Sequence, residues 1–362
     1  MSWGKRTDMT VHGEEPFNAE LPRAALADSA VTAPEAFYVR NHGPVPEIDP
    51  SSWRLRVDGL VEQELELSLE EIRGRFVEHE VTATLQCAGN RRLGFLEVRD
   101  IPGEAVWGPG ATGTAVWRGA RLTDVLKAAG LYESAEHVAF LGADISQEPD
   151  PSEAFGASIP RHKATAKEVL LAWTMNGRPL PTVHGAPLRV VVPGYIGARS
   201  VKWLERITAL PEPSKSFFQA KTYRLLTPET DPDSIALGEG VALGAVAVNS
   251  AILVPDEGAE VPAGGLRVSG YALAGDDRTI VRVDVSTDGG ETWGQADLLD
   301  ELGPWAWRLW ETEVDIGPGP LDILARAWDS AAATQPEDPA HLWNPKGYVN
   351  NAWAKVSITG GS

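Results

Sequence analysis

The sequence predicts an α+β domain followed by an immunoglobulin-like β-sandwich, divided near residue 245. The length of 362 residues favours two domains over one. The helical patterns are short and fall in the first half of the chain, between stretches with the alternation of strands. Beyond residue 245, short apolar strands follow one another with Gly and Pro between them, which is typical of a sandwich.

The first domain, residues 1–245, opens with a polar stretch over residues 1–36 that shows no clear period, and we expect irregular chain there. Residues 53–57 (WRLRV) alternate apolar and charged side chains, which predicts a half-buried strand. Residues 68–71 (SLEE) form a capping box, which predicts the start of a short helix. Residues 81–86 (VTATLQ) predict a strand that runs directly into Cys87.

Further along the first domain, residues 121–129 have the pattern of a short amphipathic helix, and Gly130 is suited to end it. Residues 188–192 (LRVVV) predict a buried strand that carries one arginine. A stretch rich in Pro, Asp and Gly, residues 227–240, lies where the composition changes between the two halves. We therefore expect the domain boundary to follow this stretch.

The second domain, residues 246–362, is predicted to be built from strands. The turn Asp288-Gly289-Gly290 favours a tight connection between two of them. Strand patterns cover residues 266–273, 280–287, 305–313 and 321–328. The chain has no pair of cysteines, so this is not a disulfide-bonded domain of the antibody type.

Composition limits the classes of function. The chain has 51 acidic and 32 basic residues, a net charge of −19, which argues against a nucleic acid or an anionic membrane as partner. Its single cysteine excludes an internal disulfide, a CxxC zinc site, a four-thiolate cluster and a c-type haem attachment site. We see no secretory signal and no apolar run of the roughly 18 residues that a membrane span needs, so we expect a cytoplasmic protein.

The segment around Cys87 is the first candidate for chemistry. The thiol follows a strand and precedes small residues and the pair Arg91-Arg92. A nearby positive charge lowers the pKa of a thiol and favours the thiolate, which is the form that binds metals. From spacing alone the alternative stays open that Cys87 is a small buried apolar residue and that the arginines face solvent.

The segment 184–203 is the second candidate. Apolar strand residues alternate there with glycine turns that expose backbone N–H groups. Arg189, Arg199 and Lys202 add three positive charges without an acidic residue between them. In a chain of net charge −19, this pattern suits a bound phosphate, although a buried strand with surface cations is an equally good interpretation of the residues alone.

These two segments resemble the molybdenum-cofactor domain of the sulfite oxidase family. The resemblance continues in order along the chain, which makes a chance match negligible, and it includes the C-terminal dimerisation domain of that family. The segments that carry it are residues 38–46 (YVRNHGPVP), 85–92 (LQCAGNRR), 117–126 (WRGARLTDVL), 155–160 (FGASIP), 175–181 (MNGRPLP), 184–203, 282–293 (RVDVSTDGGETW), 305–310 (WAWRLW) and 351–353 (NAW).

The resemblance implies a Mo-molybdopterin cofactor. It implies that Cys87 supplies the thiolate ligand of molybdenum, beside the two dithiolene sulfurs of the pterin. It also implies a set of positions that bind the pterin or its phosphate, or lie close to them, and these are Tyr38, Asn41, His42, Asp124, His184, Arg189, Ser200 and Lys202.

The resemblance further implies an oxyanion pocket and the reaction that takes place in it. The pocket residues are Arg40, Arg92, Arg308 and Tyr223. Arginine presents several donors in a fixed planar fork, which suits a small oxyanion better than lysine does. The implied reaction is oxidation of sulfite to sulfate by oxygen-atom transfer, with electrons passed to oxygen or to an external acceptor. The family also implies a homodimer formed through residues 246–362.

The chain departs from the family pattern at one pocket position. The lysine that precedes the pocket tryptophan by four residues is replaced by Gly103, if Trp107 is that tryptophan. This keeps two alternatives open: another molybdenum–pterin oxidoreductase, acting on nitrate or an S-oxide, or an inactive homologue that serves as a binding module. The presence of Cys87, Arg40 and Tyr223 argues against an inactive homologue.

Overall fold

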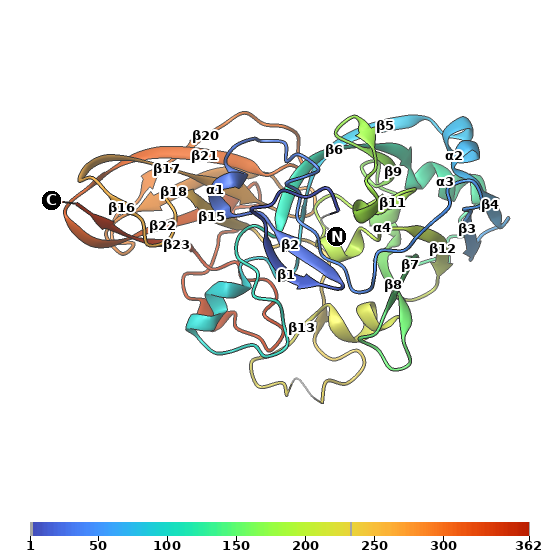
Figure 1. Ribbon diagram of the computed structural model, residues 1–362. Coiled ribbons are helices and arrows are strands. Elements are labelled where there is room, and N and C mark those ends of the chain that lie inside the picture. The colour runs from blue at the N-terminus through green and yellow to red at the C-terminus, as the bar shows by residue number, and fades with distance from the viewer. Residues whose placement is uncertain (1–2, 232–233, 362) are drawn as a thin grey trace.

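The computed structural model describes residues 3–231 and 234–361, and Figure 1 shows a mixed domain beside a β-sandwich. The mixed domain contains two five-stranded sheets. The first sheet has the order β10-β9-β6-β5, with β11 also paired to β9, and its strands are β5 (Glu78–Gln86), β6 (Thr112–Arg121), β9 (Leu170–Met175), β10 (Arg178–Pro179) and β11 (Arg189–Val191).

The second sheet of this domain has the order β4-β3-β12-β7-β8. In it β12 runs parallel to β3 and antiparallel to β7. Its strands are β3 (Leu55–Gly59), β4 (Leu65–Leu67), β7 (His137–Ser146), β8 (Glu153–Pro160) and β12 (Leu204–Leu210). Short helices connect the strands of the two sheets, and these are α2 (Leu69–Arg75), α3 (Leu122–Ala129) and α4 (Arg161–Ala164).

Both helices expected from the sequence are confirmed. In α2 the Ser68 hydroxyl accepts from the backbone N–H of Glu71 at 3.2 Å, and the Glu71 carboxylate accepts from the backbone N–H of Ser68 at 2.8 Å. This is the reciprocal capping box that the motif predicts. In α3 the apolar face is buried, and Gly130 ends the helix with a left-handed φ of +69°.

The expectation of irregular chain over residues 1–36 is wrong. Strands β1 (Thr10–Glu14) and β2 (Phe17–Glu20) form a hairpin, and α1 (Arg23–Leu26) follows it. All four residues of β2 are buried, because Glu20 accepts hydrogen bonds from the backbone of the 108–110 loop as its apolar neighbours pack into the core. A strand buried on both faces shows no alternation, which is why the sequence pattern did not reveal it.

The second domain is a sandwich of two sheets, as expected. One sheet has the order β15-β17-β21-β20 and consists of β15 (Asn249–Val254), β17 (Gly264–Leu273), β20 (Asp297–Leu298) and β21 (Arg308–Ile316). The other has the order β16-β23-β22-β18-β19 and consists of β16 (Glu260–Val261), β18 (Ile280–Ser286), β19 (Gly294–Gln295), β22 (Gly319–Asp329) and β23 (Ala354–Gly360). Val268, Val283 and Ile323 are among the buried residues that fill the space between them.

A short strand pair precedes the sandwich. It joins β13 (Arg224–Leu225) to β14 (Val241–Ala242), and a π-helical turn over Phe218–Thr222 precedes β13. In the described part of the chain, no helix combines the length and the apolar character that crossing a membrane requires.

The sandwich is fixed to the strand that leads to Cys87. The backbone N–H of Thr84 donates to the carbonyl of Trp305 at 2.9 Å, and the Thr84 hydroxyl accepts from the backbone N–H of Trp307 at 2.7 Å. Gln86 and Asn249 exchange two side-chain hydrogen bonds, at 3.0 and 3.1 Å. The C-terminal half of β5 is therefore held by both domains.

Candidate active site

A cavity lies in the mixed domain at the carboxyl end of β5. Apolar walls and several polar side chains meet in it, which is the composition of a small-molecule site. It is lined by Phe37, Tyr38, Arg40, His42, Leu85, Cys87, Ala88, Asp144, Phe155, His184, Arg189, Gly197, Ala198, Ser200, Lys202 and Tyr223. The two segments singled out in the sequence, around Cys87 and over 184–203, thus line one cavity.

Cys87 is buried, with 8% of its surface exposed, and its backbone N–H donates to the carbonyl of Ala111 at 2.9 Å. Burial raises the pKa of the thiol, and the positive charges of Arg40 and Arg92 only partly offset this effect. The expectation that the arginines alone favour the thiolate is therefore wrong for the polypeptide by itself. A bound cation at the sulfur would supply the missing stabilisation of the thiolate.

Buried cationic side chains gather at the end of the cavity formed by the 184–203 segment. Arg189 donates to the carbonyl of His184 at 2.9 Å and to that of Ser200 at 3.0 Å. Lys202 donates to the carbonyl of Arg40 at 3.2 Å and to the side-chain oxygen of Asn41. These donors are held by neutral acceptors, so their positive charges are not cancelled locally.

Lys5 joins this group from the N-terminal segment. Its ammonium lies 2.6 Å from Nε2 of His184, and it donates to the carbonyls of Pro34 and Phe37 at 2.6 and 2.7 Å. Burial lowers the pKa of Lys5 to about 7, against the favourable effect of Glu35. This contact could not be predicted from the sequence, because Lys5 lies in a stretch without a recognisable pattern.

The buried cations form no close ion pair: among the described residues, no carboxylate lies within 4.0 Å of Lys5, Arg189 or Lys202. Only the more distant charges of Glu35 and Asp144 act on Lys5 and Lys202. Burial lowers the pKa of Lys202 well below its ordinary value and that of Arg189 to about 10. Such a site is electrostatically incomplete, and an anion placed among these groups would complete it.

Asp144 and Asn41 add two buried polar atoms without partners. Oδ1 of Asp144 and Nδ2 of Asn41 accept or donate no hydrogen bond within the protein. Burial raises the pKa of Asp144 to about 6, although the charge of Lys202 acts against this. Unsatisfied polar atoms of this kind are expected where a ligand is to be bound.

His42 and Tyr223 form a pair inside the cavity. The Tyr223 hydroxyl lies 2.8 Å from Nε2 of His42, and the imidazole stacks on Phe155 with ring centres 4.6 Å apart. Burial lowers the pKa of His42 and raises that of Tyr223, so both groups are neutral near pH 7. The resemblance implied that His42 binds phosphate, whereas in the structure this side chain contacts the tyrosine of the predicted oxyanion pocket.

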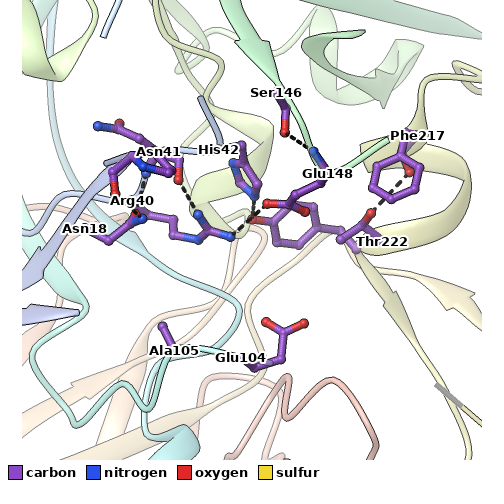
Figure 2. A network of polar contacts seen from close by, with 12 residues as sticks. Asn18, Arg40, Asn41, His42, Glu104, Ala105, Ser146, Glu148, Phe217 and Thr222 are labelled. Carbon is purple, nitrogen blue, oxygen red and sulfur yellow. Dashed lines mark hydrogen bonds and ion pairs between the residues drawn. The ribbon is translucent and has the colours of Figure 1, made fainter. Parts of the chain in front are cut away.

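Five charged residues, which we call the mouth group, are linked by ion pairs: Arg40, Arg92, Glu104, Glu148 and Lys346. Of these, Arg40 lines the cavity, and the charges of Arg40, Arg92 and Glu104 act on Cys87. Figure 2 shows Arg40 between Glu148, to which it is paired at 3.6 Å, and the loop that carries Glu104. Glu104 lies 3.5 Å from the guanidinium of Arg92 and 3.0 Å from the ammonium of Lys346. The sequence pattern missed Glu104, Glu148 and Lys346, because they come from loops whose convergence leaves no local signal.

Four predicted site residues do not line the cavity: Asn41, Arg92, Asp124 and Arg308. Asn41 accepts from Lys202, and Arg92 pairs with Glu104. Asp124 is on α3, where it pairs with Lys127 at 3.8 Å, and it does not line the cavity. Arg308 begins β21 and pairs with Glu301 at 3.3 Å. Successive side chains of a strand face opposite sides of the sheet. The Trp307 ring stacks on Tyr271, so the next side chain, that of Arg308, faces away from Tyr271. The structure therefore does not bring Asp124 and Arg308 into the cavity with the other predicted residues.

The remaining predicted residues fit the Mo-molybdopterin cofactor that the resemblance implies. The cavity presents one sulfur at Cys87 and an uncompensated cationic cluster at its other end, which match a metal and a phosphate. Gly197 allows the chain to pass close to Tyr38, because a Cβ at that position would lie 2.5 Å from the Tyr38 hydroxyl. Ser200 is fixed by accepting from the backbone N–H of Val192 at 3.0 Å.

Comparison with known proteins gives the same assignment. Residues 42–218 match the oxidoreductase molybdopterin binding domain, and residues 241–360 match the Mo-co oxidoreductase dimerisation domain. The chain is 48% identical to sulfite oxidase of Gallus gallus, covering 95% of this chain and 76% of that protein. It is 43% identical to mitochondrial sulfite oxidase of Homo sapiens, covering 97% of this chain and 65% of that protein.

The fold is also found in a solved structure. The crystal structure of the sulfane dehydrogenase SoxCD from Paracoccus pantotrophus superposes with a TM-score of 0.78 and 27% identity, covering 95% of this chain and 84% of that one. The similarity in sequence extends over nearly the whole chain and includes both domains. The chain therefore belongs to the sulfite oxidase family, as a molybdopterin-dependent oxidoreductase with a C-terminal Mo-co dimerisation domain.

Proposed function

We propose that this protein oxidises sulfite to sulfate. The observation that supports this most is the single cavity that combines the Cys87 sulfur, the buried cations and the guanidinium of Arg40. Relatives named sulfite oxidases share this fold at up to 48% identity. When bound, the molybdenum–pterin cofactor would supply oxygen-atom transfer and take up two electrons.

In this proposal the polypeptide binds the cofactor at two ends. Cys87 would ligate the metal. His184, Arg189, Ser200 and Lys202 would hold the pterin phosphate, with Lys5 adding a further buried charge. Because the cations are already desolvated and fixed by backbone carbonyls, little reorganisation is needed when the anion binds.

Arg40, Arg92 and Tyr223 would position the substrate. The two guanidinium groups provide positive charge and donors for an oxyanion. Tyr223 adds a phenol that keeps its proton near pH 7, because burial raises its pKa. His42 lies 2.8 Å from that phenol and would orient it, so the hydroxyl serves as a neutral donor with a fixed direction.

The partners follow from the same proposal. Electrons would leave to oxygen or to a separate acceptor protein. The segment 241–360, which matches a dimerisation domain, would join two copies of the chain. We propose that the protein works in the cytoplasm.

A steady-state comparison of three substrates tests the function. We expect molybdenum-loaded protein to reduce a dye with sulfite as donor, and to be much slower with nitrate or an S-oxide as acceptor. Absence of sulfite turnover in loaded protein would remove this proposal, and faster nitrate or S-oxide reduction would replace it. A metal-free product from a host that makes the cofactor would favour an inactive binding homologue.

A further inference from the structure

Two carboxylates neutralise the cations at the mouth of the site. Glu148 lies 3.6 Å from the guanidinium of Arg40. Glu104 lies between two cations, 3.5 Å from Arg92 and 3.0 Å from Lys346. Each guanidinium that would bind the substrate oxyanion therefore already has an anionic neighbour supplied by the protein.

The pair between Arg92 and Glu104 differs from an ordinary surface pair, whereas Glu148 in the pair with Arg40 is 41% exposed. The Arg92 side chain is 3% exposed and the Glu104 side chain 17%, so solvent screens their charges only weakly. Their charges also act across the site. Burial raises the pKa of Glu148, Arg40 lowers it, Glu104 raises it again and Lys346 lowers it. The mouth group thus behaves as one electrostatic unit.

The charge of this unit decides which anions it accepts. Arg40, Arg92 and Lys346 contribute three positive charges, and Glu104 and Glu148 contribute two negative ones. The surplus of one positive charge compensates a monoanion but leaves half of a dianion's charge uncompensated. Without the two carboxylates, the same donors would compensate a dianion fully.

Resting on the proposed function, we propose that Glu104 and Glu148 are specificity-determining residues that weaken the binding of dianions at the mouth. The substrate exchanges between a monoanion and a dianion near neutral pH, whereas sulfate is a dianion throughout. The two carboxylates therefore disfavour the product more than the substrate, and they promote its release.

The variant E104Q/E148Q tests this directly. Both changes keep the size of the side chain and one acceptor oxygen, remove the negative charge, and replace the second oxygen by an NH2 donor. We expect isothermal titration calorimetry to show that sulfate binds the variant holoenzyme about tenfold more tightly. The reason is that removing two negative charges leaves the nearby positive charges free to attract a partly desolvated anion. In steady state, inhibition by sulfate should strengthen by the same factor, while KM for sulfite should fall by about threefold.

A matched control variant separates the effect of the mouth-group carboxylates on sulfate affinity from the effect of the protein's net charge. The variant E64Q/E80Q also removes two negative charges, from exposed ion pairs with Arg56 and Arg118 at 3.0 and 2.6 Å. Neither pair shares a residue with the mouth group. We expect its sulfate affinity to match that of the unmodified protein. An equal gain in both double variants would show that only the general surface potential matters and would overturn the inference.

The outcomes distinguish this inference from the proposed function. Sulfate affinity is measured without turnover, so protein that fails to oxidise sulfite contradicts the function alone. An unchanged sulfate affinity in E104Q/E148Q contradicts the inference alone. If the double variant does not fold, E148Q provides the test, because Glu148 is 41% exposed and its replacement leaves the buried Arg92 pairs intact. We expect about a threefold gain for that single change.

Discussion

At the scale of single residues, Cys87 and its cationic neighbours carry the chemistry. Cys87 and the group His184, Arg189, Ser200 and Lys202 line one cavity, and the sequence could single them out because contiguous segments hold them. It could not predict Lys5, Glu104, Glu148 or Lys346. These residues enter the site from separate loops and from the N-terminal segment, and only the three-dimensional fold places them there.

Replacing Cys87 by Ala is expected to abolish metal binding. The variant removes the one thiol of the chain, and no other side chain offers the soft ligand that molybdenum would need. Metal analysis should show molybdenum reduced to background, and sulfite turnover should fall at least about 100-fold. Full activity in this variant would contradict the ligand assignment.

Replacing Lys5 by Met is expected to lower the pterin content of the purified protein, because one of the buried charges that face the phosphate is lost. The pH dependence of stability gives a second measurement. The pKa of Lys5 is about 7 in the folded protein against an ordinary value of 10.5, so the unfolded chain binds more protons between these values. The free energy of unfolding of the cofactor-free protein should therefore rise with pH in this window.

The Lys5→Met variant should lack that part of the pH dependence. Urea unfolding at pH 6.5 and pH 10 measures it, and the difference between the two proteins should change by about 2–4 kcal/mol. Below pH 7 the cost of burying the charge is fully present in the unmodified protein. Identical pH profiles for both proteins would show that Lys5 is not desolvated as described.

At the scale of elements, the close approach of the 197–199 turn to the end of β5 shapes the cavity. The capping box of α2 and the glycine stop of α3 were predictable, because each depends on residues within one turn of a helix. The hairpin β1–β2 was not, because tertiary contacts bury both faces of β2 while β1 stays largely exposed. Likewise, the sequence does not show which way the Arg308 side chain points, because that depends on which face of β21 packs inside the sandwich.

Replacing Gly197 by Ala is expected to displace Tyr38. The added Cβ would lie 2.5 Å from the Tyr38 hydroxyl and 3.2 Å from the carbonyl of Gln86. Such overpacking costs about 1–3 kcal/mol in a well-packed site, and pterin content should fall with it. Gly74→Ala is the control, because that glycine has open space in α2, and there alanine should stabilise by about 0.5–1 kcal/mol. Unfolding curves and fluorescence of released pterin measure both effects.

At the scale of the whole molecule, the two domains share the strand that positions the metal ligand. Thr84, Gln86 and Asn90 each bond to the sandwich, and Arg91 donates to the carbonyls of Ala352 and Trp353 at 2.9 and 3.0 Å. The sequence predicted two domains in this order but gave no indication of these bonds, because they join residues more than 150 positions apart.

Replacing Thr84 by Val is expected to loosen this junction. Valine has the same shape but leaves the backbone N–H of Trp307 without its acceptor, which costs about 1–3 kcal/mol for a buried group. Cys87 is three residues along the same strand, so molybdenum retention should fall as well. Tryptophan fluorescence in urea, read together with metal content, measures both. A loss of stability with full metal retention would show that the sandwich does not support the ligand strand.

The bridge from Lys346 to Glu104 means that the entrance is completed by a residue only about fifteen positions from the C-terminal end of the sequence. Arg92 also donates to the backbone carbonyl of Lys346 at 3.1 Å. A catalytic fragment that stopped after β14 would keep every cavity-lining residue yet lose the contacts of Lys346 with Glu104 and Arg92. Shortened forms of this enzyme should therefore be judged by how they discriminate between anions, and not by cofactor content alone.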